Sequence, residues 1–259
     1  KISMTFHLHT ILGARPQFIK AGALSRALKK YRDIRETIVH TGQHFDANMS
    51  DVFFKELDIP KPRYCLNINN SSHAQMTGRM LEKIEAILKE DKPDAVLVYG
   101  DTNSTLAGAL AATKLHIPVI HIEAGLRSFN RKMPEEINRI LTDHVSDYLF
   151  CSTQTAVDNL HSEGIKNGIH HVGDIMYDAA LYAMDYIKTN FSVPQKLMDF
   201  PSEFAFMTMH RAESTENMQK FQTMMNYALD FAKNHALKII FPVHPRTKAL
   251  VQKSQLNDI

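Results

Sequence analysis

The sequence predicts an α/β protein built on a doubly wound parallel sheet, with a second, smaller unit after it. Short runs rich in β-branched and aromatic residues alternate with longer stretches of helical apolar periodicity along most of the 259 residues. Such alternation favours parallel strands joined by crossover helices on both faces of a sheet. Hydrophobic residues make up 44% of the chain, which is enough for one large or two modest cores.

The first part of the chain is expected to hold six strands and five helices. Short apolar runs, most of them bounded by Gly, Asp, Ser or Thr, predict strands at 6–13, 34–42, 94–101, 117–125, 146–153 and 168–174. Apolar periodicity close to 3.6 predicts helices at 16–31, 71–91, 102–116, 133–145 and 153–164. In a parallel sheet of this kind, ligands bind outside the carboxyl ends of the strands.

A second alternating set begins near residue 175. It consists of a helix at 176–191, a proline-containing connector, a strand at 204–210, a helix at 216–235 and a strand at 237–244. We therefore predict an N-terminal Rossmann-like domain over 1–174 and a C-terminal one over 175–259. Two clear strands are fewer than a doubly wound domain has, so we expect the second domain to be incomplete in this chain.

Composition excludes several classes of protein. The formal net charge is +2, and the basic residues are spread along the chain, so neither nucleic acid nor a membrane surface is expected as a partner. No apolar run is long enough to span a membrane, and no signal-peptide pattern is present. The two cysteines, Cys65 and Cys151, have no metal-ligand spacing. We expect a cytoplasmic protein with reduced thiols.

A glycine turn after the first strand opens a helix that carries two cations. In "ILGARPQFIK", Arg15 and Lys20 lie within about one and a half helical turns of the helix start. Helix N-terminal amides and cations together suit a diphosphate, but an ordinary strand-to-helix turn with solvated cations fits equally well. Neither GxGxxG nor a P-loop motif is present, so no nicotinamide or P-loop site is expected.

Carboxylates gather where two later strands end. Asp101 follows the strand at 94–101 and also fits a helix cap. Glu123 follows "PVIHI", where an unpaired charge is costly to bury, and Arg127 and Arg139 are candidate ion partners. Glu135, with its neighbour Glu136, lies in a helix first turn, where acidic residues complement the helix dipole. We expect Asp101, Glu123 and Glu135 to converge as acid/base groups.

Histidines end both strands of the second set. His210 ends "FAFMTMH" and His244 ends "IIFPVH", so a cleft between two domains would place His210 opposite the carboxylates. An ordinary satisfied histidine remains the alternative. The chain has 14 histidines but no HExxH motif, and we expect neither a structural zinc site nor another metal.

An ordered set of motifs resembles the non-hydrolysing UDP-N-acetylglucosamine 2-epimerase family over residues 11 to 247. The motifs are GARPQFIK, TGQH, YGDTNSTLAGALAA, HIEAGLRS, MPEEINR, GD with YDA, HRAE and PVHPRT. The resemblance implies the GT-B architecture, with the active site in the cleft between two Rossmann-like domains. It implies interconversion of UDP-N-acetylglucosamine and UDP-N-acetylmannosamine by elimination of UDP to a 2-acetamidoglucal and re-addition.

Site residues carry over position by position from this resemblance. The catalytic positions fall on Asp101, Glu123, Glu135 and His210, and the positions that bind the UDP-sugar fall on Arg15, Lys20, Arg211, His244 and Arg246. Gln43 matches a position that binds a second, activating UDP-N-acetylglucosamine in bacterial members, although the other effector positions are missing. The resemblance also implies a homodimer, with no cofactor and no metal.

Other functions stay open at this point. The spellings GARPQFIK and GLRSFNRKMPEEINR are similar to relatives that act on UDP-2,3-diacetamido-2,3-dideoxyglucuronate. A GT-B glycosyltransferase that uses a UDP-sugar shares the architecture, and a hydrolysing relative would release free N-acetylmannosamine. A truncated binding module is the non-enzymatic option, since a chain that ends at Ile259 is expected to bind UDP poorly.

Overall fold

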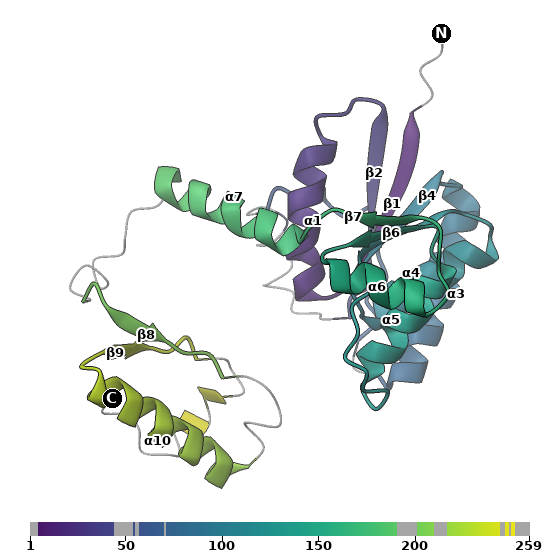
Figure 1. Ribbon diagram of the computed structural model, residues 1–259. Coiled ribbons are helices and arrows are strands. Elements are labelled where there is room, and N and C mark those ends of the chain that lie inside the picture. Colours follow the sequence, from purple (N-terminus) through teal and green to yellow (C-terminus); the bar gives the residue numbers. More distant parts are fainter. Residues whose placement is uncertain are drawn as a thin grey trace. The chain divides into compact units, whose positions relative to one another are not determined.

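The first compact unit is a seven-stranded parallel sheet with helices on both faces (Figure 1). The structure is a computed structural model that describes residues 5–43, 54, 57–69, 71–190, 201–209, 217–243, 247–248 and 250–251. The strand order is β3-β2-β1-β4-β5-β6-β7. The strands are β1 (Phe6–Leu12), β2 (Ile34–His40), β3 (Tyr64–Cys65), β4 (Ala95–Tyr99), β5 (Val119–Ala124), β6 (Tyr148–Cys151) and β7 (Ile169–His171).

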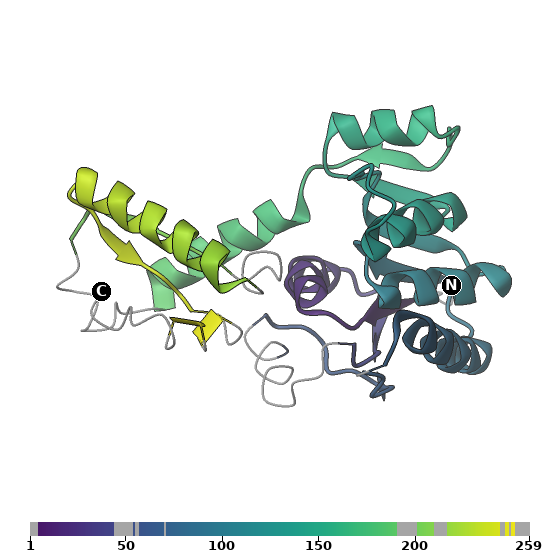
Figure 2. The same ribbon diagram turned by 90° about the horizontal axis from the view of Figure 1, so that it is seen from below.

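Helices cover the two faces of this sheet in the doubly wound manner that the alternation predicts. They are α1 (Arg15–Leu28), α3 (His73–Asp91), α4 (Asn103–Lys114), α5 (Pro134–Val145), α6 (Gln154–Ser162) and α7 (Ile175–Asn190). Helices α3 and α4 pack against one face and α1 against the other (Figure 2). After β3, at the edge of the sheet, the chain crosses over to β4 on the other side of β1, so the strand order reverses between β1 and β4. Ligand sites in such sheets lie at this reversal.

Each face has its own apolar core, because successive residues of a strand point to opposite sides. On the α3 side, Ile11 of β1 and Val98 of β4 meet Ile84. On the α1 side, Leu12 and Leu97 meet Phe18. Helix α4 packs closely on the sheet through its small residues, as its composition predicts. A Cβ on Gly108 would lie 3.1 Å from side-chain carbons of both Ile11 and Val98.

The second compact unit spans residues 191–259. Its described part contains β8 (Phe204–Phe206), α10 (Met218–Asn234) and β9 (Lys238–Ile240), and β8 pairs with β9 in parallel. Phe221 and Met225 of α10 pack with Met209 in its core. Neither unit has a described helix that is long and apolar enough to cross a membrane.

The predicted strands and helices are all present within the described residues, and the strands are shorter than predicted. The sequence reading missed β3, which has only two residues. The predicted domain boundary lies between residues 174 and 175, whereas the compact units divide after Asn190. Helix α7 packs against α1, for example where the Arg26 guanidinium lies 3.5 Å from the centroid of the Tyr182 ring.

Candidate functional site

Three neighbouring strands, β1, β4 and β5, bring charged residues to the carboxyl edge of the sheet. The strands are parallel and adjacent, so the loops that follow them lie side by side. The loop after β1 leads into Arg15, the loop after β4 contains Gly100 and Asp101, and Glu123 is the next-to-last residue of β5. This arrangement agrees with the edge that the sequence predicts for Asp101 and Glu123.

A β-bulge aims Glu123 toward α1. The pairing of β5 with β6 shifts register between Ile122 and Ala124, and Glu123 has a φ of 72°. A left-handed conformation is strained for any residue with a Cβ, and such strain gathers at functional sites. The Glu123 carboxylate forms an ion pair with the buried ammonium of Lys20. A Cβ on Gly100 would lie 3.2 Å from Glu123 Oε2 and 3.3 Å from Lys20 Nζ, so this pair borders the β4 loop.

Asp101 is held by the first turns of α5. Its carboxylate accepts a hydrogen bond from Arg139, and its backbone carbonyl accepts one from Asn138 Nδ2 at 2.9 Å. The cap of α4 is Thr102, whose hydroxyl accepts from the Thr105 amide. Helix capping therefore does not account for the Asp101 side chain, which is 32% exposed.

The two neighbouring glutamates of α5 differ completely in their surroundings. Glu136 is buried and accepts hydrogen bonds from the amides of Ser128 and Phe129 and from Arg139. Burial alone would raise its pKa, but the Ser128 amide, Arg139 and the Phe129 amide together lower that pKa to about 2. Glu135 is exposed, and it makes no hydrogen bond or ion pair with any described residue.

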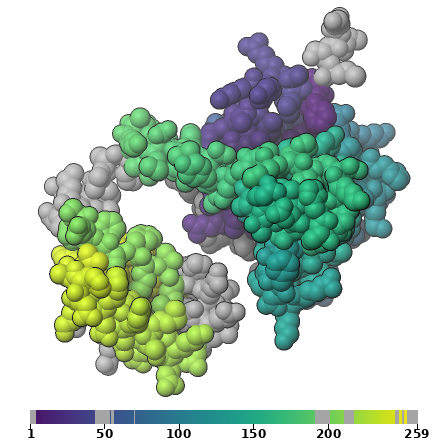
Figure 3. Space-filling view, viewed as in Figure 1, coloured from purple at the N-terminus to yellow at the C-terminus, as the bar shows by residue number. Residues whose placement is uncertain are grey.

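The loop that precedes these glutamates projects from the first unit. Residues 125–133 connect β5 to α5, and the teal segment stands out from the surface in Figure 3. Phe129 in this loop is 79% exposed. Glu136 fixes the loop to α5 through the two amide contacts.

A second charged network lies behind this edge and is fully buried at its centre. Asp143 accepts hydrogen bonds from His121 Nδ1 at 2.7 Å, from Arg127 at 2.7 Å and from the Gly125 amide at 3.1 Å. Arg127 also makes two 2.7 Å bonds to Glu163. Burial opposes ionisation of Asp143, but His121 and Arg127 outweigh it and lower the Asp143 pKa. His121 Nε2 lies 2.8 Å from the Gly100 carbonyl oxygen.

The ion partners expected for Glu123 belong to other carboxylates. Arg127 pairs with Asp143 and Glu163, and Arg139 pairs with Asp101 and Glu136. The sequence-based expectation was wrong because neighbours along a loop need not face each other. Lys20 is 103 residues away from Glu123, and no sequence pattern signals that contact. The spacing of Glu136 and Arg139, three residues apart on one helix, does signal their pairing.

The start of α1 offers less to an anion than the sequence suggested. The Gln17 side chain accepts from the amides of Gly13 and Ala14, at 2.8 and 2.9 Å. These two donors are therefore used inside the protein. Arg15 lies exposed at the first position of the helix, while the Lys20 ammonium is used by Glu123.

Gln43, the possible effector residue, is tied to α4. Its side-chain oxygen accepts from the Ser104 amide at 3.0 Å and from the Ser104 hydroxyl at 2.7 Å. This contact satisfies a donor in the first turn of α4. It gives Gln43 a structural role in the described part of the chain.

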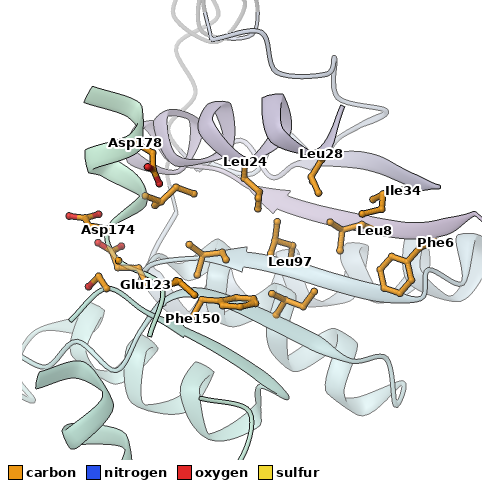
Figure 4. Close-up of a pocket in the computed structure, with 16 residues that line it drawn as sticks. Phe6, Leu8, Leu24, Leu28, Ile34, Leu97, Glu123, Phe150, Asp174 and Asp178 are labelled. Atoms are coloured by element: carbon orange, nitrogen blue, oxygen red, sulfur yellow. The ribbon is translucent and has the colours of Figure 1, made fainter. Parts of the chain in front are cut away.

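An apolar pocket of about 400 Å³ opens on the α1 side of the sheet (Figure 4). Leu8, Leu97 and Phe150 line its walls, and Glu123, Asp174 and Asp178 lie together at one end. An apolar surface with carboxylates at its mouth disfavours a diphosphate. We do not assign this pocket to a nucleotide.

Four predicted site residues, His210, Arg211, His244 and Arg246, lie outside the described residues. The structure thus places the Lys20–Glu123 ion pair beside the loop that contains Asp101. Helix α5, which carries Glu135, contacts Asp101 through Arg139. Asp101 and Glu123 follow or end adjacent strands and have different cationic partners, and Glu135 has none among the described residues. This arrangement can accept and deliver protons at one edge of the sheet.

Comparison with known proteins gives a consistent family. The family model described as UDP-N-acetylglucosamine 2-epimerase matches residues 26–258. A UDP-N-acetylglucosamine 2-epimerase homolog of Methanococcus maripaludis is 52% identical over 95% of this chain and 68% of its own length. The UDP-2,3-diacetamido-2,3-dideoxy-D-glucuronate 2-epimerase of Pseudomonas aeruginosa is 51% identical over 94% of this chain and 68% of its own length.

Solved structures agree with these sequence matches. The Methanocaldococcus jannaschii UDP-GlcNAc 2-epimerase, crystallised with UDP-GlcNAc and UDP, has 44% identity and a TM-score of 0.85. The match covers 98% of this chain and 70% of that one. The Neisseria meningitidis enzyme bound to UDP-GlcNAc has 31% identity and a TM-score of 0.85, over 97% of this chain and 70% of that one. These likenesses confirm the predicted α/β fold class of GT-B type.

Proposed function

Because this chain belongs to the UDP-N-acetylglucosamine 2-epimerase family, a family of isomerases, we propose that it inverts C2 of a UDP-linked amino sugar. The substrate is UDP-N-acetylglucosamine, which is converted reversibly to UDP-N-acetylmannosamine. The observation that supports this most is the pairing of Asp101 with Arg139 and of Glu123 with Lys20, at the ends of adjacent strands.

The chemistry explains why such a site needs several carboxylates. The proton on C2 is not acidified by a carbonyl, so its direct removal is slow. In the proposed route a base takes the C2 proton, the C–H electrons form a C1=C2 double bond, and the C1–O bond breaks with its electrons going to UDP. Re-addition returns UDP to C1 and delivers a proton to the opposite face of C2. Proton-transfer groups are thus required on both faces.

We assign the two proton transfers to Asp101 and Glu135. Asp101 is partly exposed and its carboxylate contacts Arg139 on one side, which leaves lone pairs that a substrate can reach. Glu135 is exposed in the first turn of α5 and has no described partner, so it is free to contact a substrate. Glu123, held by Lys20, positions or assists these groups. His210 is proposed to stabilise the departing diphosphate.

Residues of both units are proposed to supply the cations that contact the diphosphate. Arg15 at the first position of α1 remains a proposed phosphate contact, together with Arg211, His244 and Arg246 of the second unit. Lys20 keeps its proposed place near the phosphates, and its pairing with Glu123 would couple the diphosphate to that carboxylate. We further propose a cytoplasmic homodimer without metal or cofactor in the reaction.

A second substrate is favoured by a specific observation. The Pseudomonas aeruginosa relative at 51% identity is a UDP-2,3-diacetamido-2,3-dideoxy-D-glucuronate 2-epimerase, whereas the Methanocaldococcus jannaschii UDP-N-acetylglucosamine 2-epimerase has 44% identity. Inversion of UDP-2,3-diacetamido-2,3-dideoxyglucuronate by the same route is therefore our alternative proposal.

One experiment tests both proposals. The protein is incubated in deuterated water with each UDP-sugar separately, and C2 deuterium and the products are read by proton NMR. Deuterium at C2 with a manno product from one substrate supports the epimerase and selects its sugar. Free N-acetylmannosamine with UDP would point to a hydrolysing enzyme. No exchange with either sugar would contradict the proposal and favour an acceptor-dependent transferase or a binding module.

A further inference from the structure

A second group of polar residues lies at the opposite end of the central strands. His7 and His9 are two residues apart on β1, so they point to the same face of the sheet. They are paired laterally with Arg35 and Thr37 of β2. Asp91, the last residue of α3, reaches the same place. This end of β1 is remote from the edge that carries Asp101 and Glu123.

His9 is a buried side chain without hydrogen bonds. It is fully buried, and neither Nδ1 nor Nε2 makes a hydrogen bond with a described residue. Its Nε2 lies 3.1 Å from Asp91 Oδ2, but the geometry is not that of a hydrogen bond. Buried polar groups without partners are costly and rare in folded proteins. An imidazole nitrogen this close to a carboxylate oxygen, without a hydrogen bond between them, suits a ligand that both atoms share.

The atoms have a spacing close to that of a metal site. Nitrogen and oxygen ligands of a tetrahedral zinc ion lie about 2.0–2.1 Å from the metal, which places neighbouring ligand atoms roughly 3.3 Å apart. His9 Nε2 and Asp91 Oδ2, at 3.1 Å, already have this spacing. One ligand atom each from His7, His9 and Asp91 lie within 4.8 Å of one another. This spread is wider than that of bound ligand atoms, so the His7 ring has to move toward the other two when a metal binds.

The groups around these three residues support the ligands on one side and block them on the other. The Tyr64 hydroxyl donates to Asp91 Oδ2 at 3.0 Å, the kind of support that orients a ligating carboxylate. Arg63 lies 3.6 Å from Asp91 Oδ1 and is half exposed. The Arg35 guanidinium lies 3.1 Å from His7 Nδ1 and 3.2 Å from His7 Nε2, and that Nε2 also lies 2.9 Å from the Thr37 hydroxyl, so a metal would have to displace these contacts. Arg35 is exposed and can therefore turn into water when His7 binds another cation.

We propose that His7, His9 and Asp91 bind one divalent transition-metal ion, such as Zn²⁺, Ni²⁺ or Co²⁺. Two imidazoles and a carboxylate suit ions of this class and leave a fourth position open for water. The negative end of the α3 dipole lies at Asp91 and favours a cation there. The ion would join β1 to α3 and stabilise the fold, apart from the reaction at C2. The sequence-based expectation of no structural zinc site did not foresee this group, because Asp91 is 82 residues from His9.

The test measures metal binding to the purified full chain. Zn²⁺ is titrated by calorimetry after removal of metal, and Co²⁺ is followed by its visible absorption. We expect one ion per chain, and we expect His9→Leu and Asp91→Asn each to weaken binding by at least about tenfold. Arg35→Gln removes a competing cation and is expected to tighten binding several-fold. The exposed pair His170 and His171 on β7 supplies the control, because their double replacement by Ala should leave binding unchanged.

This test is independent of the proposed reaction, because it measures metal binding and not hydrogen exchange at C2. Circular dichroism checks folding, and His7→Gln with Asp91→Asn decides the matter if His9→Leu does not fold. Binding that survives in these variants, or that disappears in the His170/His171 variant, would show adventitious surface coordination and overturn the proposal. Weaker binding in Arg35→Gln would contradict the inferred competition between Arg35 and the metal.

Discussion

Two charged networks lie near the end of β5, and they use similar residues in opposite ways. In the inner network Asp143 is fully buried and accepts from His121, Arg127 and the Gly125 amide. In the outer network Asp101 is 32% exposed and its carboxylate contacts Arg139. The inner carboxylate is saturated with donors, whereas the outer one keeps accessible lone pairs.

This difference teaches that charge at a strand end is not by itself a sign of chemistry. A saturated, buried network holds the loops after β4 and β5 in place, because His121 reaches the Gly100 carbonyl and Asp143 the Gly125 amide. A partly exposed carboxylate with a cation on one side can still exchange a proton with a substrate. Substitutions in the outer network should therefore lower turnover, and substitutions in the inner network should lower stability.

The largest effect is expected for the outer carboxylates. Asp101→Asn and Glu135→Gln should each lower C2 deuterium exchange by roughly two to four orders of magnitude, the usual scale for general acid–base groups. Thermal unfolding should change little, because both side chains are at least partly exposed. Near-normal exchange by either folded variant would remove that residue from the mechanism.

A smaller effect, and on a different quantity, is expected from the inner network. Asp143→Asn removes a charge that neutralises the buried Arg127 guanidinium, and leaving a buried charge unpaired costs about 3–5 kcal/mol. We expect the free energy of unfolding, from urea denaturation, to fall by about 3 kcal/mol because Glu163 still pairs with Arg127. Exchange at C2 should fall far less than in Asp101→Asn. Equal losses of exchange in both variants would erase the distinction between the networks.

Low pH should weaken the contacts by which Glu136 fixes the loop at 125–133 to α5. Glu136 has a folded-state pKa of about 2 against an ordinary value of 4.5. Its contribution is fully present above pH 4.5 and is lost as the pH falls toward 2. The shift corresponds to at most roughly 3 kcal/mol. Denaturation curves between pH 5 and 2 should show this slope, and the slope should flatten in Glu136→Gln. An unchanged slope in that variant would assign the acid sensitivity to other groups.

The smallest effect concerns the bulge that aims Glu123. Both Glu123→Gly and Glu123→Ala remove the ion pair with Lys20, so their difference isolates the backbone. At a φ of 72°, glycine is unstrained and alanine is not, and we expect the glycine variant to be more stable by about 1 kcal/mol. Urea denaturation of the two variants measures the difference. An alanine variant that is as stable as the glycine variant would show that the bulge relaxes.

Much of the fold and part of the site could be predicted because they depend on local patterns. Alternating apolar runs predict the strands of the first sheet, and parallel connections place Asp101 and Glu123 at one edge. Thr102 rather than Asp101 caps α4, and Glu123 pairs with Lys20 rather than with Arg127 or Arg139. The partner of Glu123 was missed because short-range spacing says nothing about which distant side chain occupies the space beside a carboxylate.

By itself the sequence determined the α/β class, the order of the elements and the strand ends at which charge collects, because periodicity and turn chemistry act within a few residues. Only the tertiary structure decided which carboxylates are saturated and which remain accessible. It also decided that Asp91 meets His9 and that Gln43 binds the first turn of α4. These contacts join residues far apart in the chain, and their energies depend on burial and on the direction of each side chain, which exist only once the sheet and its helices have packed.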